Sequence, residues 1–139
     1  DVLGRISMAK NNLITPQAYK KDAQAIINDT HAKKPEICNI YARYAEKCRQ
    51  AGVMDFDDIL LNMNILFRDN PEALASVASR FDYILVDEYQ DTNVAQYIIL
   101  KKLSQGHHNI CVVGDDSQSI YAFRGAKIEN ILNFRKDYP

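Results

Sequence analysis

Four apolar residues followed by two acids occupy residues 83–88, which read Y-I-L-V-D-E. A second, largely apolar run lies at residues 109–113, N-I-C-V-V, and G-D-D follows it at 114–116. Apolar runs of this length without alternation are typical of strands that are buried on both faces of a parallel sheet. Residues 92–103 between them carry apolar side chains at helical spacing. The pattern predicts a strand–helix–strand unit with a right-handed crossover.

Residues 15–79 are predicted to form successive helices. Thr15 followed by Pro16 is typical of a helix start, because threonine caps free N–H groups and proline fits the first helical position. Gly52 is typical of a helix end, since glycine adopts the left-handed conformation without steric cost. We predict four helices, which open at Thr15-Pro16, Lys34-Pro35, Asp55 and Asn70-Pro71.

The composition is that of a folded globular chain. It has 139 residues, of which 47% are apolar, and this is enough to bury a core in one domain or two small lobes. We interpret the three widely spaced cysteines as small buried hydrophobic residues in a reducing cytoplasm, rather than as metal ligands or disulfides. No histidine has ligand spacing with them, so no zinc site is predicted.

The chain begins at Asp1 without a methionine, a signal peptide or a long apolar span. We therefore expect it to be cut from inside a larger cytoplasmic protein and to have no membrane contact.

Charge is distributed unevenly along the chain. Residues 1–50 hold nine Lys/Arg and five Asp/Glu, a net charge of +4, and the remainder holds eight and thirteen, a net charge of −5. A basic part that meets an anion and an acidic part that binds a cation would explain this distribution. Ordinary solvated helix faces would explain it equally well.

Acidic residues follow both predicted strands. Asp87 and Glu88 follow the first strand directly, and Asp115 follows the second after a glycine. Neighbouring strands lie about 4.8 Å apart, so these carboxylates would converge if the strands pair. Carboxylates that close favour a hard cation such as Mg²⁺. An apolar strand that ends in Asp-Glu also resembles a Walker B element, although acids that simply enter a turn would give the same short pattern.

Three longer strings resemble one family in order and spacing. Residues 82–93 read D-Y-I-L-V-D-E-Y-Q-D-T-N, residues 112–126 read V-V-G-D-D-S-Q-S-I-Y-A-F-R-G-A, and residues 54–60 read M-D-F-D-D-I-L. They are similar to motif II, motif III and the string before motif II in the superfamily 1 DNA helicases related to UvrD, Rep and PcrA. The resemblance is strongest over residues 53–135.

This resemblance implies an α/β fold and an activity. The fold would be a helical 1B-like lobe at residues 1–65, followed at 66–139 by part of a P-loop NTPase (RecA-like) motor subdomain with a partial parallel sheet. The activity would be that of an ATP-dependent translocase that moves 3′ to 5′ on single-stranded DNA and unwinds duplex junctions. A helicase subunit of a recombinational helicase–nuclease shares the same motifs.

The resemblance also assigns roles to individual residues. Asp87 would hold Mg²⁺ bound to ATP, Glu88 would be the catalytic base, and Gln118 would sense the γ-phosphate. Gln90 would line the nucleotide cleft. The residues that would face DNA are Tyr121, Phe123 and Arg124, with core packing as the alternative for the two rings.

Four further residues have local roles in this interpretation. Asp91 and Thr92 are predicted to cap the crossover helix. Asp55 and Phe56 are expected either to position the junction between the lobes or to touch DNA, and a simple helix start is equally compatible with Asp55.

The chain departs from the family pattern in two respects. Phe123 stands where many relatives have tryptophan, which leaves less ring area for stacking. No glycine is followed by a second glycine five residues later, and there is no Gly-Lys pair, so the sequence has no Walker A loop. We expect these 139 residues alone to be catalytically inactive, and to cover an exposed sheet edge by self-association or by local rearrangement.

Two interpretations from other classes remain open at this point. One is a non-catalytic DNA- or partner-binding module in which the carboxylates are structural. The other is a magnesium-dependent phosphotransfer or receiver-like domain that uses Asp87, Asp115 and Asp116.

Overall fold

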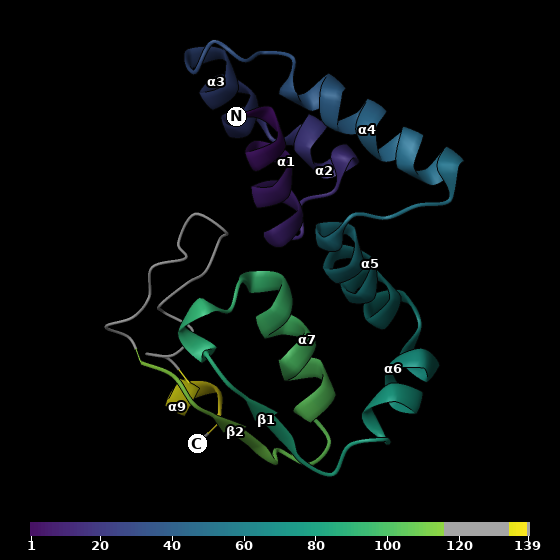
Figure 1. Ribbon diagram of the computed structural model, residues 1–139, viewed down its shortest axis with the longest axis vertical. Helices are drawn as coiled ribbons and strands as arrows, with labels where there is room; N and C mark the ends of the chain where they lie inside the picture. Colours follow the sequence, from purple (N-terminus) through teal and green to yellow (C-terminus); the bar gives the residue numbers. More distant parts are fainter. Residues whose placement is uncertain (116–133, 139) are drawn as a thin grey trace.

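Helices dominate the first 78 residues of the computed structural model, and a small sheet with its own helices follows (Figure 1). The structure describes residues 1–115 and 134–138. Its elements are α1 Val2–Asn11, α2 Pro16–Lys21, α3 Ala23–His31, α4 Ile37–Ala51, α5 Phe56–Asp69, α6 Pro71–Ala78, β1 Ile84–Val86, the 3-10 turn η1 Tyr89–Asp91, α7 Val94–Ser104, β2 Ile110–Val112 and α9 Phe134–Asp137. Within these ranges, no helix is both long and apolar enough to cross a membrane.

The predicted capping residues set most helix boundaries. Thr15 Oγ1 accepts a hydrogen bond from the N–H of Ala18 and so caps α2. Gly52 ends α4 in the left-handed conformation, with φ of +66°. Asp55 and Asn70 cap α5 and α6. The helix starts at residues 15, 55 and 70, and the helix end at 52, are therefore confirmed.

Two features of the helical region differ from the prediction. α1 was not predicted, because half of its buried residues are polar (Lys10 and Asn11), which leaves no apolar stripe to detect. The single helix predicted after Pro16 is also wrong. Asp22 has an extended backbone and accepts a hydrogen bond from the N–H of Ala25, and this bond ends α2 and begins α3.

The core of the helical region is built on two tyrosines. Tyr19 and Tyr41 pack edge to face with their ring centroids 6.0 Å apart, in a buried cluster with Ile6, Ala9 and Ile37. Their hydroxyls remain bonded, because a buried O–H needs a partner. Tyr19 donates to Asp29 at 2.7 Å, and Tyr41 donates to the carbonyl of Ile14 at 2.9 Å.

Polar side chains join α1 to α5. Lys10 is 1% exposed, and its Nζ lies 2.6 Å from Asp55 and 2.7 Å from Asp58. Asn11 donates to Asp57 at 2.9 Å. A buried ammonium group is stable only when it is paired in this way. The two helices are therefore held in one relative position.

A second set of polar bonds joins these helices to α7. Asn93, which precedes α7, donates to Asn11 at 2.6 Å, and Asn64 of α5 donates to the carbonyl of Ala95 at 3.0 Å. In Figure 1, α5 runs from the upper helices down to the level of α7. Residue 65, the predicted boundary between the lobes, lies inside α5. That division stays a prediction.

The two strands pair in parallel, as predicted. Ile84 lies opposite Ile110, and Val86 lies opposite Val112. α7 connects the strands, which confirms the strand–helix–strand order. Among the described residues the sheet has only these two strands, so each has one edge without a strand partner.

The prediction that the strands are buried on both faces is wrong for the described chain. Leu85 is 78% exposed, and Cys111 opposite it is exposed as well, whereas their neighbours along each strand are half-buried. Side chains alternate between the faces of a strand, so one face is covered and the other is open. The interpretation of the cysteines as buried fails for the same reason at Cys111, while Cys38 and Cys48 are half-buried.

Candidate active site

The ends of β1 and β2 meet at one edge of the sheet. Pairing continues beyond the strands, since the N–H of Val113 donates to Val86 at 2.8 Å and the N–H of Tyr89 donates to Val113 at 2.9 Å. Asp87 and Glu88 leave β1 at this edge, and Asp115 lies three residues beyond the last residue of β2. The structure thus brings together the two chain segments whose acids were predicted to converge.

Glu88 has an unusual backbone conformation. Its φ of +51° and ψ of +41° place it in the left-handed region, which costs a non-glycine residue about 1–2 kcal/mol. The carboxylate of Asp87 accepts a hydrogen bond from the N–H of Glu88 at 2.9 Å and so supports this turn. Leu13, Lys33 and His108 share this conformation, and at Glu88 it fixes the direction in which the side chain leaves the backbone.

Asp87 and Glu88 each keep part of their carboxylate available. Both residues are exposed. Asp87 uses Oδ1 to accept from the N–H of Glu88, and Glu88 uses Oε2 to accept from Gln90 at 2.6 Å. The second oxygen of each group, Oδ2 and Oε1, has no hydrogen-bond partner among the described residues and is open to a ligand.

A pocket of about 390 Å³ opens beside these carboxylates. Its acidic side is formed by Asp87, Glu88 and Asp91, and its other lining residues are Leu60, Val86, Thr92, Gln96, Ile99 and Leu100. One oxygen of Asp91, Oδ1, is buried and has no hydrogen-bond partner among the described residues. A buried carboxylate oxygen without a partner is costly, so a proton donor or a cation at Asp91 would be stabilised.

The carboxylates of this pocket fit a hard divalent cation whose remaining ligands are water or phosphate oxygens. All three acidic side chains of the pocket offer oxygen, which Mg²⁺ prefers. No group of three or more His, Cys, Asp or Glu side chains in residues 1–115 and 134–138 could hold a metal by itself. Mg²⁺ commonly binds through one or two carboxylates, with water and phosphate oxygens completing its shell.

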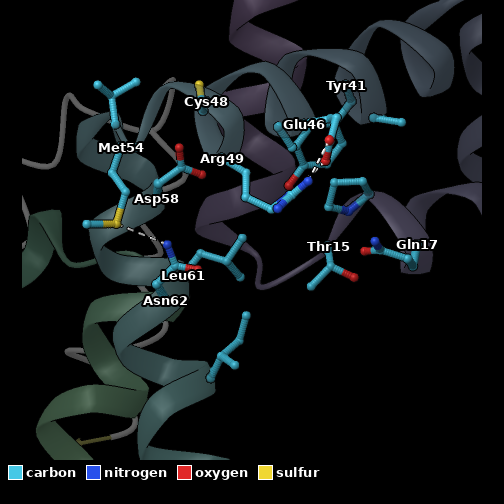
Figure 2. A pocket seen from close by; sticks show the side chains of 16 residues that line it. Thr15, Gln17, Tyr41, Glu46, Cys48, Arg49, Met54, Asp58, Leu61 and Asn62 are labelled. Atoms are coloured by element: carbon cyan, nitrogen blue, oxygen red, sulfur yellow. Dashed lines mark hydrogen bonds and ion pairs between the residues drawn. The ribbon is translucent and has the colours of Figure 1, made fainter.

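A larger pocket of about 510 Å³ lies elsewhere, between α2, α4 and α5 (Figure 2). Its charged residues are already paired: Arg49 points at Glu46 and contacts it at 2.7 Å, and Asp58 is held by Lys10. Arg49 and Gln50 lower the pKa of the Glu46 carboxyl by hydrogen bonding to its ionised form. Because these charges are paired with one another, we assign this pocket no chemistry.

The predicted site residues fall into two groups. Asp87, Glu88 and Gln90 lie together at the strand ends. Gln118, Tyr121, Phe123 and Arg124, together with Asp116, lie outside the described residues.

The predicted cap of the crossover helix is wrong by one or two residues. Asn93 caps α7, and Gln96 bonds back to the N–H of Asn93 in a capping box. Asp91 lies in the 3-10 turn, and Thr92 uses its hydroxyl to donate to the carbonyl of Tyr89. Because η1 occupies Tyr89–Asp91, α7 begins only at Val94. The spacing Asn-x-x-Gln is a known capping signal, and it would have identified the correct residue.

Asp55 is both a helix start and part of the junction between α1 and α5. It accepts from Tyr44 at 2.7 Å as well as from Lys10. Burial raises the pKa of the Asp55 carboxyl, but the hydrogen bonds from Lys10 and Tyr44 outweigh burial and bring the pKa below its usual range. Phe56, the next residue, is 89% exposed. The helix start at Asp55 is thus confirmed, whereas a role at the junction between the two predicted lobes and a DNA contact at Phe56 stay predictions.

Comparison with known proteins identifies the family. The profile of the UvrD/REP helicase N-terminal domain matches residues 1–139, the whole chain. The chain belongs to this family. Its UvrD/REP relatives include "ATP-dependent DNA helicase PcrA" of Bacillus subtilis (strain 168), with 45% identity over 138 residues, and the protein of the same name in Leuconostoc citreum, with 44% identity over 138 residues.

A third UvrD/REP relative is "ATP-dependent DNA helicase PcrA" of Staphylococcus aureus (strain NCTC 8325 / PS 47), which is 45% identical over 137 residues. In all three comparisons the match covers 99% of this chain and 18% of the relative. The chain thus spans less than a fifth of the length of these relatives.

Proposed function

We propose that this chain is part of the motor of an ATP-dependent DNA helicase, and that the edge of the sheet after β1 is where ATP hydrolysis is catalysed. The observation that carries the proposal is the acidic pair Asp87-Glu88, held at the paired ends of two parallel strands in a member of the UvrD/REP helicase family. Ligands of open parallel sheets bind at this end of the strands.

The two carboxylates have different tasks in the proposed reaction. Asp87, through Oδ2, would hold Mg²⁺, because Oδ1 is already bonded to the N–H of Glu88. When bound, Mg²⁺ would neutralise charge on the phosphates of ATP. Glu88, through Oε1, would orient the attacking water and accept its proton, because Oε2 is bonded to Gln90.

The segment after β2 would carry the link to DNA. By family resemblance, Gln118 would sense the γ-phosphate, while Tyr121, Phe123 and Arg124 would contact single-stranded DNA. An aromatic ring stacks on any base and contributes about 1–3 kcal/mol per base, so binding would not depend on sequence. Movement 3′ to 5′, unwinding at duplex junctions and a cytoplasmic location belong to the same proposal.

The test is ATP hydrolysis by the complete gene product that carries this chain, with and without single-stranded DNA. Wild type is expected to need Mg²⁺ and to be stimulated by DNA. Glu88→Gln should lower kcat by about 100-fold or more while ATP still binds, since a positioned general base contributes roughly 10²–10⁴-fold. Glu46→Gln changes an exposed carboxylate of α4 in the same way and should leave kcat unchanged.

Absence of any ATP hydrolysis in a folded wild type would contradict the proposal. A non-catalytic DNA- or partner-binding module would then be the better interpretation.

The 139 residues alone are proposed to be inactive and to self-associate. The sequence holds no Walker A loop to bind phosphates, and β1 and β2 each have an edge without a strand partner in the described part of the chain. Light scattering after size-exclusion chromatography should show a mass above 15.9 kDa that rises with concentration. A clean monomer at high concentration would contradict the self-association.

A further inference from the structure

Gln90 connects the two strand ends through one side chain. It lies in the turn η1 and is 1% exposed. Its Nε2 donates to Oε2 of Glu88 at 2.6 Å, and its Oε1 accepts from the backbone N–H of Asp115 at 3.0 Å. A buried amide therefore joins the proposed base after β1 to the segment that follows β2.

The orientation of this amide is determined by its partners. A backbone N–H can only donate, so the oxygen of the Gln90 amide must face Asp115. The NH₂ group then faces Glu88, where an ionised carboxylate can only accept. A flipped amide would place a donor against a donor and an acceptor against an acceptor. The direction of both bonds is thus fixed by chemistry.

The Glu88 side chain needs such a support. The side chain is exposed. It leaves a backbone with positive φ, a conformation that few residues other than glycine adopt. Gln90 is buried, so its own side chain is held in one place. A hydrogen bond from a fixed group to an exposed carboxylate restricts where the free oxygen, Oε1, can lie. A general base must lie within about 3 Å of the proton that it takes.

A direct contact between Gln90 and nucleotide fits the structure less well. Gln90 is absent from the lining of the 390 Å³ pocket, whereas Asp87, Glu88 and Asp91 on either side of it line that pocket. The side chain is buried, and both ends of its amide are engaged. Gln90 is therefore placed to act through Glu88.

We propose that Gln90 is a positioning residue that fixes the Glu88 carboxylate and makes its position depend on the segment that begins at Asp115. The inference rests on the proposed function. Residues 116–126, which follow Asp115 directly, carry the string proposed to sense the γ-phosphate and to contact DNA. A displacement of Asp115 on DNA binding would move the amide of Gln90 and thereby the base.

The test compares two variants of Gln90 in the complete gene product. Gln90→Met keeps the length of the side chain and removes both hydrogen bonds. It should lower the DNA-stimulated kcat by roughly 10- to 100-fold, because a base displaced by about 1 Å loses up to about 100-fold. The KM for ATP should change less than about twofold, and the rate without DNA should fall less than the stimulated rate.

Gln90→Glu keeps an acceptor for the N–H of Asp115 and sets a carboxylate against Glu88. The two carboxylates repel each other, so the bond that holds Oε2 of Glu88 is lost while the bond to Asp115 is kept. This variant should therefore lower the DNA-stimulated kcat by roughly 10- to 100-fold and change the KM for ATP by less than about twofold. A residue that only stabilised the fold would lower the urea midpoint without this difference between kcat and KM.

The matched control is Gln50→Met. Gln50 makes the same kind of bond, donating to Glu46 at 2.7 Å on an exposed face of α4. Its kcat, KM and DNA stimulation should equal those of wild type.

Each outcome decides the proposal. If Gln90→Met keeps kcat and DNA stimulation within about twofold while Glu88→Gln is inactive, the inference fails and the proposed function stands. If wild type shows no DNA-stimulated hydrolysis, both fail. If Gln90→Met does not fold, Gln90→Glu decides, and a DNA-stimulated kcat within about twofold of that of wild type overturns the inference.

Discussion

The junction of α1 with α5 and the edge of the sheet after β1 both contain acidic residues, but they use them differently. At the junction, Asp55 and Asp58 surround a lysine that is 1% exposed, and their partners come from distant parts of the chain. At the sheet edge, Asp87 and Glu88 are exposed, and within the part of the chain that the structure describes they bond to residues one or two positions away. Carboxylates with distant buried partners stabilise a fold, whereas exposed ones with a free oxygen can bind a ligand.

The largest effect on stability is expected at the junction. Lys10→Met leaves Asp55 and Asp58 without their cation, and loss of one partner of a buried pair costs about 3–5 kcal/mol. Both carboxylates are partly exposed, so we expect the free energy of unfolding to fall by about 3 kcal/mol. Urea unfolding followed by circular dichroism measures this.

The control for Lys10 is Arg49→Met, which breaks an exposed ion pair with Glu46 on α4. Its unfolding midpoint should equal that of wild type, because exposed pairs contribute little. Equal midpoints for Lys10→Met and Arg49→Met would contradict the difference drawn between the two regions.

An intermediate effect on stability is expected at Asn93, whose side chain bonds the start of α7 to α1. Asn93→Ala removes the cap of α7 and leaves the buried oxygen of Asn11 without its donor. A lost cap costs about 1 kcal/mol, and an unsatisfied buried group adds a similar amount, so the free energy of unfolding should fall by about 2 kcal/mol.

Gln96→Ala removes only the return bond of the capping box. It should cost about half as much as Asn93→Ala. If the two variants are equally stable, the bond between Asn93 and Asn11 does not hold α7 against α1.

The last effect depends on pH and concerns the helical core. Burial and the hydrogen bond to Asp29 raise the pKa of Tyr19 from 10.0 to about 12. The folded state therefore binds this proton more tightly than the unfolded state does. The stability that Tyr19 contributes is complete below pH 10.0 and is lost as pH rises toward about 12.

Tyr19→Phe tests this linkage. The variant should be less stable than wild type at neutral pH and should lose less stability between pH 10.0 and about 12. Parallel stability curves for the two proteins over that range would contradict the assignment.

Local signals in the sequence predicted most of the fold. Thr15, Gly52, Asn70 and the two apolar runs each specify backbone geometry by their own chemistry, and the elements formed where they indicated. α1 was missed because its buried face depends on Lys10 and Asn11, whose partners at residues 55–58 no local pattern reveals. The exposure of Leu85 likewise depends on what covers the sheet, which the composition of the strand does not encode.

The position of Asp87 and Glu88 after a strand was predictable from the sequence, but the bonds that hold them were not. Asp87 and Glu88 follow from a strand that ends in two acids. The amide bridge of Gln90 depends on the distance between two strand ends and on burial of the turn between them. A sequence pattern contains neither quantity.

The most direct test of this account measures kcat and the unfolding midpoint of Glu88→Gln together in the complete gene product. We expect kcat for DNA-stimulated ATP hydrolysis to fall by about 100-fold or more and the urea midpoint to stay at the wild-type value, since Glu88 is exposed. Retention of kcat, or a loss of activity that is matched by a loss of stability, would contradict it.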